Sequence, residues 1–173
     1  MTATAIKPVS RRSILQLSLI SVSAAMLSQP ILAATGTSKP LITVWKTPTC
    51  GCCKAWVAHL RENDFDVVTN DVEDTTAIRK KLGYPDKYGS CHTAKLGDYV
   101  IEGHVPAEDI RKLLSDKPHA RGLSVLGMPL GSPGMEGTGP FAGERHAYNV
   151  LLVLYDGNAR VFKSYAAIAS NKS

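Results

Sequence analysis

The sequence predicts a single α/β domain, and three observations lead to that fold class. An apolar run over residues 41–45 predicts a short buried strand. It is followed over 51–63 by a stretch in which Trp56 and Leu60 recur at the spacing of one helix face. Apolar and polar residues then alternate over 65–69, as in a strand with one buried face. The 173 residues are enough for one domain with its own core, and no internal repeat is found.

The elements that follow extend this pattern. A helix is expected from Asp74 or Thr75, either of which can cap it, to Leu82, and Gly83 ends it. The resulting strand–helix–strand beginning favours parallel pairing of the first two strands, joined by a right-handed crossover.

A hairpin and another helix complete the first part of the domain. Residues 93–96 and 99–102 flank Gly97 and Asp98, a dipeptide typical of a two-residue hairpin turn. A further helix is expected over 105–114. The order of elements to this point is β-α-β-α-β-β-α.

The chain changes character over residues 117–146, which are dense in Gly and Pro and include the segment Gly127–Met135. A loop of this length is uncommon within a domain unless it is functional or disordered. After it, residues 148–155 and 160–165 predict a C-terminal β-hairpin. The predicted fold is therefore an α/β domain with a long Gly/Pro-rich loop and a terminal hairpin.

Residues 1–34 predict an export signal peptide. A basic beginning precedes a moderately apolar run over 14–27, and the small residues at the end suit cleavage after Ala33 or Ala34. Behind the signal we expect a tether over 35–40, the folded domain over 41–165 and a tail over 166–173. The basic side chains of the signal are Lys7, Arg11 and Arg12.

Two alternatives stay open for this segment. Residues 10–15 resemble the twin-arginine signal, which exports folded proteins, but the general secretory route fits as well. A membrane anchor is the other reading, yet Gln and Ser interrupt the apolar run, which falls short of a span of about 20 residues. We therefore expect no stable membrane span after signal cleavage, and a periplasmic location that tolerates disulfides.

The formal net charge of +5 does not predict a nucleic-acid partner. Three of the 20 basic side chains lie in the signal, which has no acid. The remainder has 17 basic and 15 acidic side chains and no basic run, so it is nearly neutral.

The stretch Thr47–Trp56 carries the chemistry, because it holds three of the four cysteines: Cys50, Cys52 and Cys53. They lie between the first predicted strand and helix and enter the first helical turn. Unpaired N–H groups and the positive end of the helix dipole stabilise a thiolate there. Three thiolates are more than thiol exchange requires, so the stretch has the outline of a soft-metal site.

Four thiolates in an exported protein select soft ions, which are Cu(I), Zn(II) or an iron–sulfur cluster. Adjacent Cys52 and Cys53 point in different directions on a helix, which suits a single tetrahedral site poorly. Thiolates that bridge several Cu(I) ions relieve this geometry, and we therefore hypothesise a thiolate-bridged copper cluster. The competing interpretation is a structural disulfide, for example Cys50 or Cys53 with Cys91.

The order of elements, with cysteines after the first strand, resembles the thioredoxin fold. The Cys-x-x-Cys motif of that family matches Cys50 and Cys53. The resemblance implies that the loop Gly89–Thr93 lies against the cysteine turn, so that Cys91 and His92 face it. The proline that the family usually carries in this loop is absent here.

Three segments together resemble the CopG-like periplasmic metal-binding proteins of bacterial copper resistance. They are Val44–Trp56 with its Cys-x-Cys-Cys motif, Gly103–Ala107 and Gly127–Met135. The resemblance covers about residues 40–165. It implies a thioredoxin-like domain that holds copper on its cysteines. The copper could form a multinuclear cluster, and it could cycle between Cu(I) and Cu(II).

The resemblance also implies a set of metal ligands. The thiolates would be those of Cys50, Cys52, Cys53 and Cys91. The Gly-rich segment adds two thioethers, and a histidine before the third helix is a further candidate; each of these three could instead pack or hydrogen-bond locally. These three candidates are Met128, Met135 and His104.

Other residues near the motif have weaker claims. His92 is a candidate only through its neighbour Cys91, and Lys46 and Lys54 could help to keep thiolates ionised. The two tryptophans are expected in the core, and the remaining histidines are expected outside the site. These are Trp45, Trp56, His59, His119 and His146.

Three functions compete at this point. The first is a periplasmic copper-binding protein of copper tolerance, which stores Cu(I) or changes its oxidation state. The second is a thiol–disulfide oxidoreductase with Cys50 as nucleophile and Cys53 as resolving thiol. The third is a copper chaperone that passes its ion to a partner. Whether the chain is an enzyme stays open, and the expected partners are metal ions and a periplasmic copper-handling or redox protein.

Overall fold

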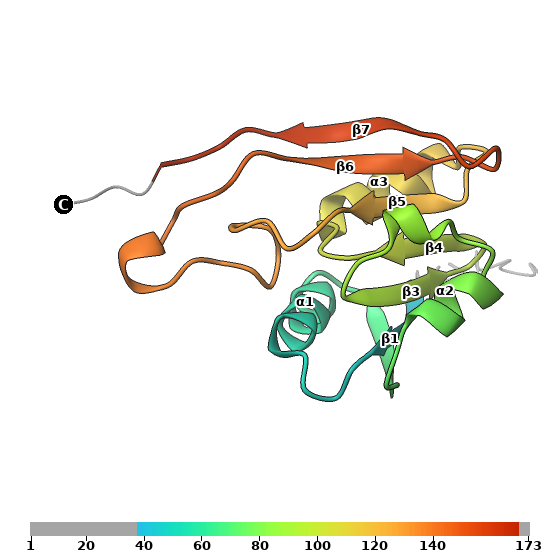
Figure 1. The fold of residues 1–173 in the computed structure, drawn as a ribbon, viewed down its shortest axis with the longest axis horizontal. Helices are drawn as coiled ribbons and strands as arrows, with labels where there is room; N and C mark the ends of the chain where they lie inside the picture. The colour runs from blue at the N-terminus through green and yellow to red at the C-terminus, as the bar shows by residue number, and fades with distance from the viewer. Residues whose placement is uncertain (1–37, 170–173) are drawn as a thin grey trace, which may run out of the picture. The chain divides into compact units, whose positions relative to one another are not determined.

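A computed structural model describes residues 38–169 of the chain. The predicted signal over 1–34, the first three residues of the tether and the last four residues of the tail lie outside these described residues. In this described part of the chain, seven strands form one sheet (Figure 1). They are β1 (Leu41–Lys46), β2 (Asp66–Asp71), β3 (His92–Leu96), β4 (Tyr99–Glu102), β5 (Gly122–Val125), β6 (Tyr148–Val153) and β7 (Ala159–Tyr165).

The strands lie in the order β2-β1-β3-β4-β5-β6-β7. The pairs β1–β2 and β4–β5 are parallel, and the other four pairs are antiparallel. The parallel pairing of the first two strands and the hairpin around Gly97 and Asp98 confirm the sequence predictions. The described residues therefore have a mixed α/β fold.

Over residues 38–169, three helices pack beside the sheet: α1 (Gly51–Glu62), α2 (Thr76–Lys81) and α3 (Ala107–Asp116). The N-cap of α2 is Thr75, one of the two residues expected there, but its side chain makes no capping bond. Oδ1 of the preceding Asp74 accepts the N–H of Thr76 at 2.9 Å instead. Two short 3₁₀ turns, η1 (Asp86–Tyr88) and η2 (Gly139–Phe141), lie in the connections. No helix in the described part of the chain has the length and apolarity needed to cross a membrane.

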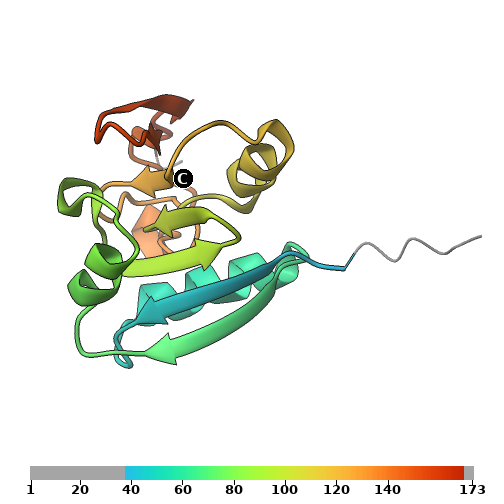
Figure 2. The same cartoon turned by 90° about the vertical axis from the view of Figure 1, so that its right-hand side faces the viewer.

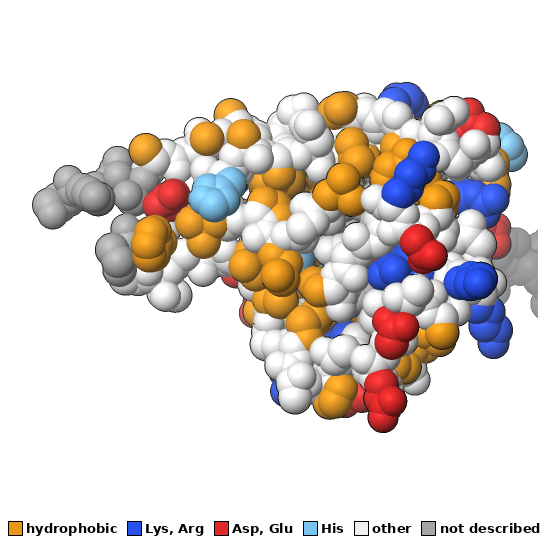
Figure 3. Space-filling view, viewed as in Figure 1, with side chains coloured by type: hydrophobic (Ala, Val, Ile, Leu, Met, Phe, Trp, Pro, Cys, Tyr) orange, Lys and Arg blue, Asp and Glu red, His pale blue; other side chains and the backbone are white. Residues whose placement is uncertain are grey.

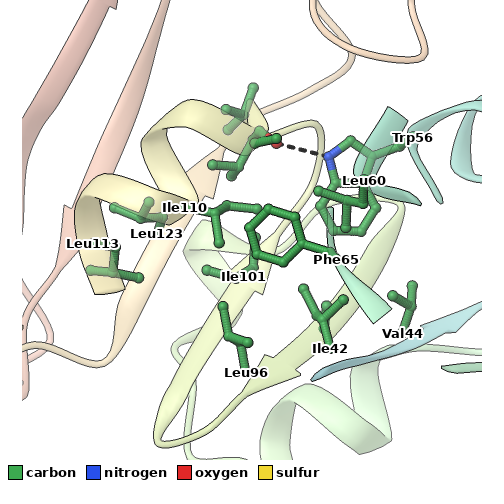
Figure 4. Packing of buried hydrophobic residues seen from close by; sticks show 14 of the residues in the cluster. Ile42, Val44, Trp56, Leu60, Phe65, Leu96, Ile101, Ile110, Leu113 and Leu123 are labelled. Atoms are coloured by element: carbon green, nitrogen blue, oxygen red, sulfur yellow. Dashed lines mark hydrogen bonds between the residues drawn. The ribbon is translucent and has the colours of Figure 1, made fainter. Parts of the chain in front are cut away.

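The hydrophobic core lies where α1 and α3 meet the sheet (Figure 4). Trp56 and Leu60 of α1 are fully buried, as their helical spacing predicted. The indole Nε1–H of Trp56 donates to the carbonyl oxygen of Val105 at 2.8 Å, which ties α1 to the segment that leads into α3. Ile110 and Leu113 complete the packing from α3.

The prediction of an unbroken loop over 117–146 is wrong in one place, because Gly122–Val125 forms β5. This strand is buried along its whole length between β4 and β6. Gly122 permits the close approach, since a Cβ there would lie 1.8 Å from the carbonyl oxygen of Val100. As a result, the terminal hairpin joins the main sheet through β5.

The remaining connection, residues 126–147, carries the Gly-rich segment toward the first turn of α1 (Figures 1 and 2). A Cβ on Gly134, whose φ is +82°, would lie 2.7 Å from both the Cys52 carbonyl oxygen and the Trp56 amide nitrogen. Only a glycine lets the loop approach α1 this closely. An isolated bridge between Arg145 and Ile168 holds the far end of the connection.

Candidate metal centre

The cysteine turn joins β1 to α1, as the strand-to-helix pattern predicted. Cys50 is the N-cap residue of α1, and its sulfur accepts the backbone N–H of Cys53 at 3.3 Å. No acidic side chain lies in the first turn of this helix. The sulfur therefore takes the place that an oxygen of Asp or Ser usually holds at a helix N-terminus.

All four cysteine sulfurs meet at this turn. The Sγ atoms of Cys50, Cys52, Cys53 and Cys91 lie within 4.8 Å of one another. Cys53 is buried and the other three are partly exposed, so the cluster opens to the surface on one side. Such a set of thiols is the donor group that soft metal ions prefer.

Two of the four sulfurs are joined in the structure. Cys50 and Cys53 form a disulfide, while Cys52 and Cys91 are free thiols. The competing interpretation of a disulfide with Cys91 as one partner is therefore not the pairing observed, whereas the observed pair is the one named for the oxidoreductase alternative. The Cys50 sulfur still lies 3.5 Å from that of Cys52. The first and last cysteines of the motif are therefore oxidised to a disulfide, while the cysteine between them, Cys52, is a free thiol.

Cys91 comes from the loop before β3 and faces the cysteine turn, where the thioredoxin resemblance placed it. Burial, with a further contribution from the neighbouring Cys52 thiol, raises the pKa of Cys91 to about 11. This thiol is therefore protonated at neutral pH, and a metal that binds it must displace the proton.

His104, the candidate histidine, reaches the cluster from the segment before α3. It is fully buried, and its Nε2 lies 3.2 Å from the Cys91 sulfur. Its other ring nitrogen, Nδ1, is 2.8 Å from the Pro133 carbonyl oxygen, which can only accept. Nδ1 must therefore carry the proton. Burial lowers the pKa of His104, so its Nε2 is an unprotonated nitrogen beside the thiols.

His92 lies closer to the centre than its sequence position alone indicated. Its ring is fully buried against the ring of Trp56, with 4.3 Å between centroids. Its Nδ1 is 3.3 Å from the Cys91 sulfur, so that Cys91, His92 and His104 form a second group of donor atoms within 4.8 Å. Burial and the neighbouring His104 lower the pKa of His92 to about 3, which keeps it neutral.

One of the two candidate methionines touches the cluster. The Met128 sulfur lies 3.9 Å from the Cys52 sulfur, and its side chain is 54% exposed. Met135 instead holds the loop through its backbone: its N–H donates to the Ser132 carbonyl, and its own carbonyl accepts the N–H of Gly131. Hydrophobic side chains gather on the face where this loop meets α1 (Figure 3).

The weaker candidates divide between core and surface. Trp56 is core as expected, whereas Trp45 is only partly buried and is not among the core residues, and Lys54 is exposed. Lys46 is buried, and its ammonium group forms an ion pair with the carboxylate of Asp71. His59 was expected on the surface but is half-buried, and its Nε2 accepts the backbone N–H of Ala107 at 3.1 Å. The remaining histidines, His119 and His146, are exposed and outside the cluster.

Sequence reasoning missed the polar residues that hold the Cys91 loop. Glu102 and Arg79 are both buried, and both bind the backbone of Ser90. The available signal was an acidic residue at the end of the otherwise apolar strand β4. A buried carboxylate needs a partner, and that need points to a nearby arginine.

The described residues therefore define a class: mixed α/β proteins with a partly exposed, sulfur-rich donor set beside two neutral histidines. A family model described as "Protein of unknown function, DUF411" matches residues 88–135. A search of curated proteins finds no match.

Two solved structures are similar to most of the described chain. One, titled "Copper resistance protein copG- Form 1", is 40% identical, with a TM-score of 0.68; the match covers 74% of this chain and 98% of that one. The "Form 2" structure of the same name is 40% identical with a TM-score of 0.67, over 73% and 98%. The chain belongs to the family of the copper resistance protein CopG.

Proposed function

We propose that this chain is an exported copper-binding protein of copper tolerance that holds Cu(I) on its cysteine cluster. The observation that carries the proposal is the meeting of four cysteine sulfurs within 4.8 Å in a CopG family member. Thiolate, thioether and neutral imidazole are the donors that suit Cu(I). The ligand set is Cys50, Cys52, Cys53 and Cys91, with His104, Met128 and Met135 as further donors.

The spacing of the thiols supports a cluster of several ions. Cys52 and Cys53 are neighbours in the first turn of α1, where one sulfur is half-exposed and the other buried. One tetrahedral ion is awkward for two adjacent cysteines, whereas bridging thiolates serve ions on either side. In this proposal Cys53 contributes only after its disulfide with Cys50 is reduced.

The disulfide also supports a redox role in which the bound ion is the substrate. When the thiols of Cys50 and Cys53 form their disulfide, they release two electrons and two protons. Two Cu(II) ions accept these electrons and become two Cu(I) ions, so the step balances. Cys52 and Cys91 are free to hold Cu(I) while the disulfide is present.

The proposal also includes a periplasmic location and a thioredoxin-like ancestry of the fold. The basic and apolar sequence before residue 35 supports export to the periplasm, with signal cleavage near Ala33 or Ala34. A thioredoxin-like ancestry is supported by the order β1-α1-β2-α2-β3-β4-α3 and by the Cys-x-x-Cys pair at the start of α1. The strands β5 to β7 are then an addition that supplies the Gly-rich connection.

A thiol–disulfide oxidoreductase is the second candidate, and the Cys50–Cys53 disulfide favours it. Such an enzyme needs neither Cys52 nor Cys91, whereas the copper proposal needs both. A copper chaperone is the third candidate, because Met128 is more than half exposed beside Cys52 and would be accessible to a copper-handling partner.

Anaerobic Cu(I) titration of residues 35–173, after reduction of the disulfide, tests the proposal. Copper retained after desalting is counted by elemental analysis for the wild type and for the C52S variant, with circular dichroism as the check on folding. We expect several tightly held ions in the wild type and a loss of most of them in C52S. A ratio that never exceeds one ion contradicts the cluster. No retained copper, with rapid exchange of the disulfide with a dithiol, replaces the proposal with the oxidoreductase.

A further inference from the structure

Ser90 binds three separate parts of the molecule through its three polar groups. Its backbone N–H donates to Oε2 of Glu102 at 3.0 Å. Its carbonyl oxygen accepts a bond from Nη2 of Arg79 at 3.1 Å. Its hydroxyl donates to the carbonyl oxygen of Gly127 at 3.1 Å. A residue with this many directed bonds has little freedom to move, although it lies in a loop.

The two charged groups that bind the Ser90 backbone are themselves fixed. Glu102 is fully buried and Arg79 is 6% exposed. The Arg79 Nε and the Glu102 Oε1 lie 3.1 Å apart as an ion pair, without the alignment of a hydrogen bond. Nη2 of Arg79 also donates to Oγ1 of Thr75 at 3.2 Å. Charge-assisted bonds from a buried pair are strong, so Ser90 has a rigid support.

The space beside Ser90 is kept open by Gly103. A Cβ on this glycine, whose φ is +71°, would lie 2.6 Å from the Ser90 hydroxyl oxygen and 2.5 Å from the Val125 carbonyl oxygen. Gly103 immediately precedes His104, so the segment that carries the histidine passes directly against Ser90. The serine thus lies between the two strand ends, β3 and β4, that present donors to the centre.

The hydrogen bond from the Ser90 hydroxyl to the Gly127 carbonyl links two residues that each precede a sulfur donor in the sequence. Ser90 precedes Cys91, and Gly127 precedes Met128. The Met128 side chain is 54% exposed, and its sulfur contact is with Cys52 at 3.9 Å. An exposed methionine has several rotatable bonds, so a fixed backbone is needed to keep its sulfur near the thiols. The Ser90 hydroxyl fixes the backbone at Gly127, the residue immediately before Met128.

We infer that Ser90 is a positioning residue that acts through Gly127 to hold the Met128 sulfur over the cysteine cluster. The inference deepens the proposed function and rests on it for the copper measurement. Its physical basis is preorganisation: ordering the Met128 loop in advance removes a cost that metal binding would otherwise bear. The Arg79–Glu102 pair is the support on which this arrangement depends.

A double-mutant cycle tests the inference with the S90A and M128L variants. S90A removes one oxygen and leaves the backbone bonds of Ser90 in place. S164A is the matched control, because the Ser164 hydroxyl also donates a single bond, to Oδ1 of Asn149 at 2.7 Å, on the terminal hairpin. Cu(I) affinity of the reduced chain is measured by competition with a chromophoric chelator. In the metal-free, disulfide-bonded chain, the ¹³C-methyl resonance of Met128 is followed by NMR.

We expect S90A to weaken Cu(I) binding about tenfold, the lower end of what partners behind a metal ligand contribute. The double variant should bind no more weakly than M128L alone, since Ser90 acts through Met128. S164A should match the wild type. In the metal-free chain, the Met128 methyl signal of S90A should move toward the position of an unrestrained methionine.

Two results would overturn the inference. One is an S90A variant with wild-type affinity and an unchanged Met128 methyl signal. The other is an additive loss in the double variant, which would mean that Ser90 acts elsewhere. If the wild type itself binds no copper, the proposed function fails, while the metal-free NMR comparison still decides whether Ser90 positions Met128.

Discussion

The Nδ1–H of His104 donates to the carbonyl oxygen of Pro133 across 2.8 Å, so a single bond sets the proton position on the ring. The carbonyl has no proton to give, and burial holds the pKa of His104 below its usual value. The lone pair on Nε2 therefore faces the Cys91 thiol, 3.2 Å away. Pro133 lies in the Gly-rich connection, which thus orients a residue that belongs to another part of the fold.

The first prediction concerns this lone pair. Replacing His104 with Gln should weaken Cu(I) binding about tenfold or more, because the variant lacks a neutral imidazole nitrogen beside Cys91. The measurement is chelator competition on the reduced protein. H119Q is the matched control, since His119 is exposed and outside the cluster. Equal affinities for H104Q and H119Q would exclude His104 as a ligand.

The second prediction concerns the contact between the Gly-rich segment and α1. A Cβ in a G134A variant would meet two backbone atoms at 2.7 Å, the Cys52 oxygen and the Trp56 nitrogen, so the loop must move away. Gly143 is the matched control, because it also has a positive φ, +77°, but open space around it. G143A should cost about 1–2 kcal/mol of backbone strain.

We expect G134A to be less stable than G143A in urea unfolding and also to bind Cu(I) more weakly, because it displaces the loop that carries Met128 and Pro133. G143A should retain the wild-type copper affinity. The contact would lose its assigned role if the two variants behaved alike in both measurements.

The cysteine turn could be predicted from sequence because its causes are local. A β-branched run ends at Lys46, and the helical spacing of Trp56 and Leu60 begins a few residues later, so the cysteines between them had to occupy the strand-to-helix turn. The hairpin around Gly97 was equally local, since that glycine adopts a φ of +58°.

Strand β5 and several contacts of the site could not be predicted from the sequence, because they depend on residues far apart in the chain. β5 contains a glycine and a serine in four residues, and it is a strand because β4 and β6 flank it. The sequence of β3 does not indicate that His92 is buried against Trp56, 36 positions earlier. The link from Ser90 to Gly127 likewise joins residues 37 positions apart. Contacts of this kind follow from sheet order, which no local pattern contains.

The third prediction follows from the raised pKa of Cys91, about 11. In the metal-free protein with its disulfide intact, the Cys91 thiol should react slowly with iodoacetamide at pH 8, because the thiolate is the nucleophile. Roughly one thiol in a thousand is then ionised. Mass spectrometry of the alkylated peptides separates Cys91 from Cys52. Labelling of Cys91 as rapid as that of a model thiol would contradict the pKa shift.

The fourth prediction concerns the pH dependence of stability. His59 accepts the Ala107 N–H, at the beginning of α3, through an unprotonated Nε2. Burial lowers the pKa of His59 below 6.5, outweighing the nearby Glu136 and Glu62. As the pH falls, His59 is therefore protonated at a higher pH in the unfolded chain than in the folded protein. The stabilisation is fully present above about pH 6.5 and is lost as the pH falls through the lower folded value.

Urea unfolding of the metal-free protein at pH 7.5 and pH 5 measures this effect. The H59Q variant retains a side-chain oxygen that can accept the Ala107 N–H but has no proton to gain. We expect the wild type to lose about 1 kcal/mol more than H59Q between the two pH values, the size of one hydrogen bond. H119Q is the matched control, because it also replaces a histidine by Gln, at an exposed position outside the contact between His59 and Ala107. If H59Q and H119Q lose equal stability on acidification, the proton acts at another residue and His59 is only a packing partner of α3.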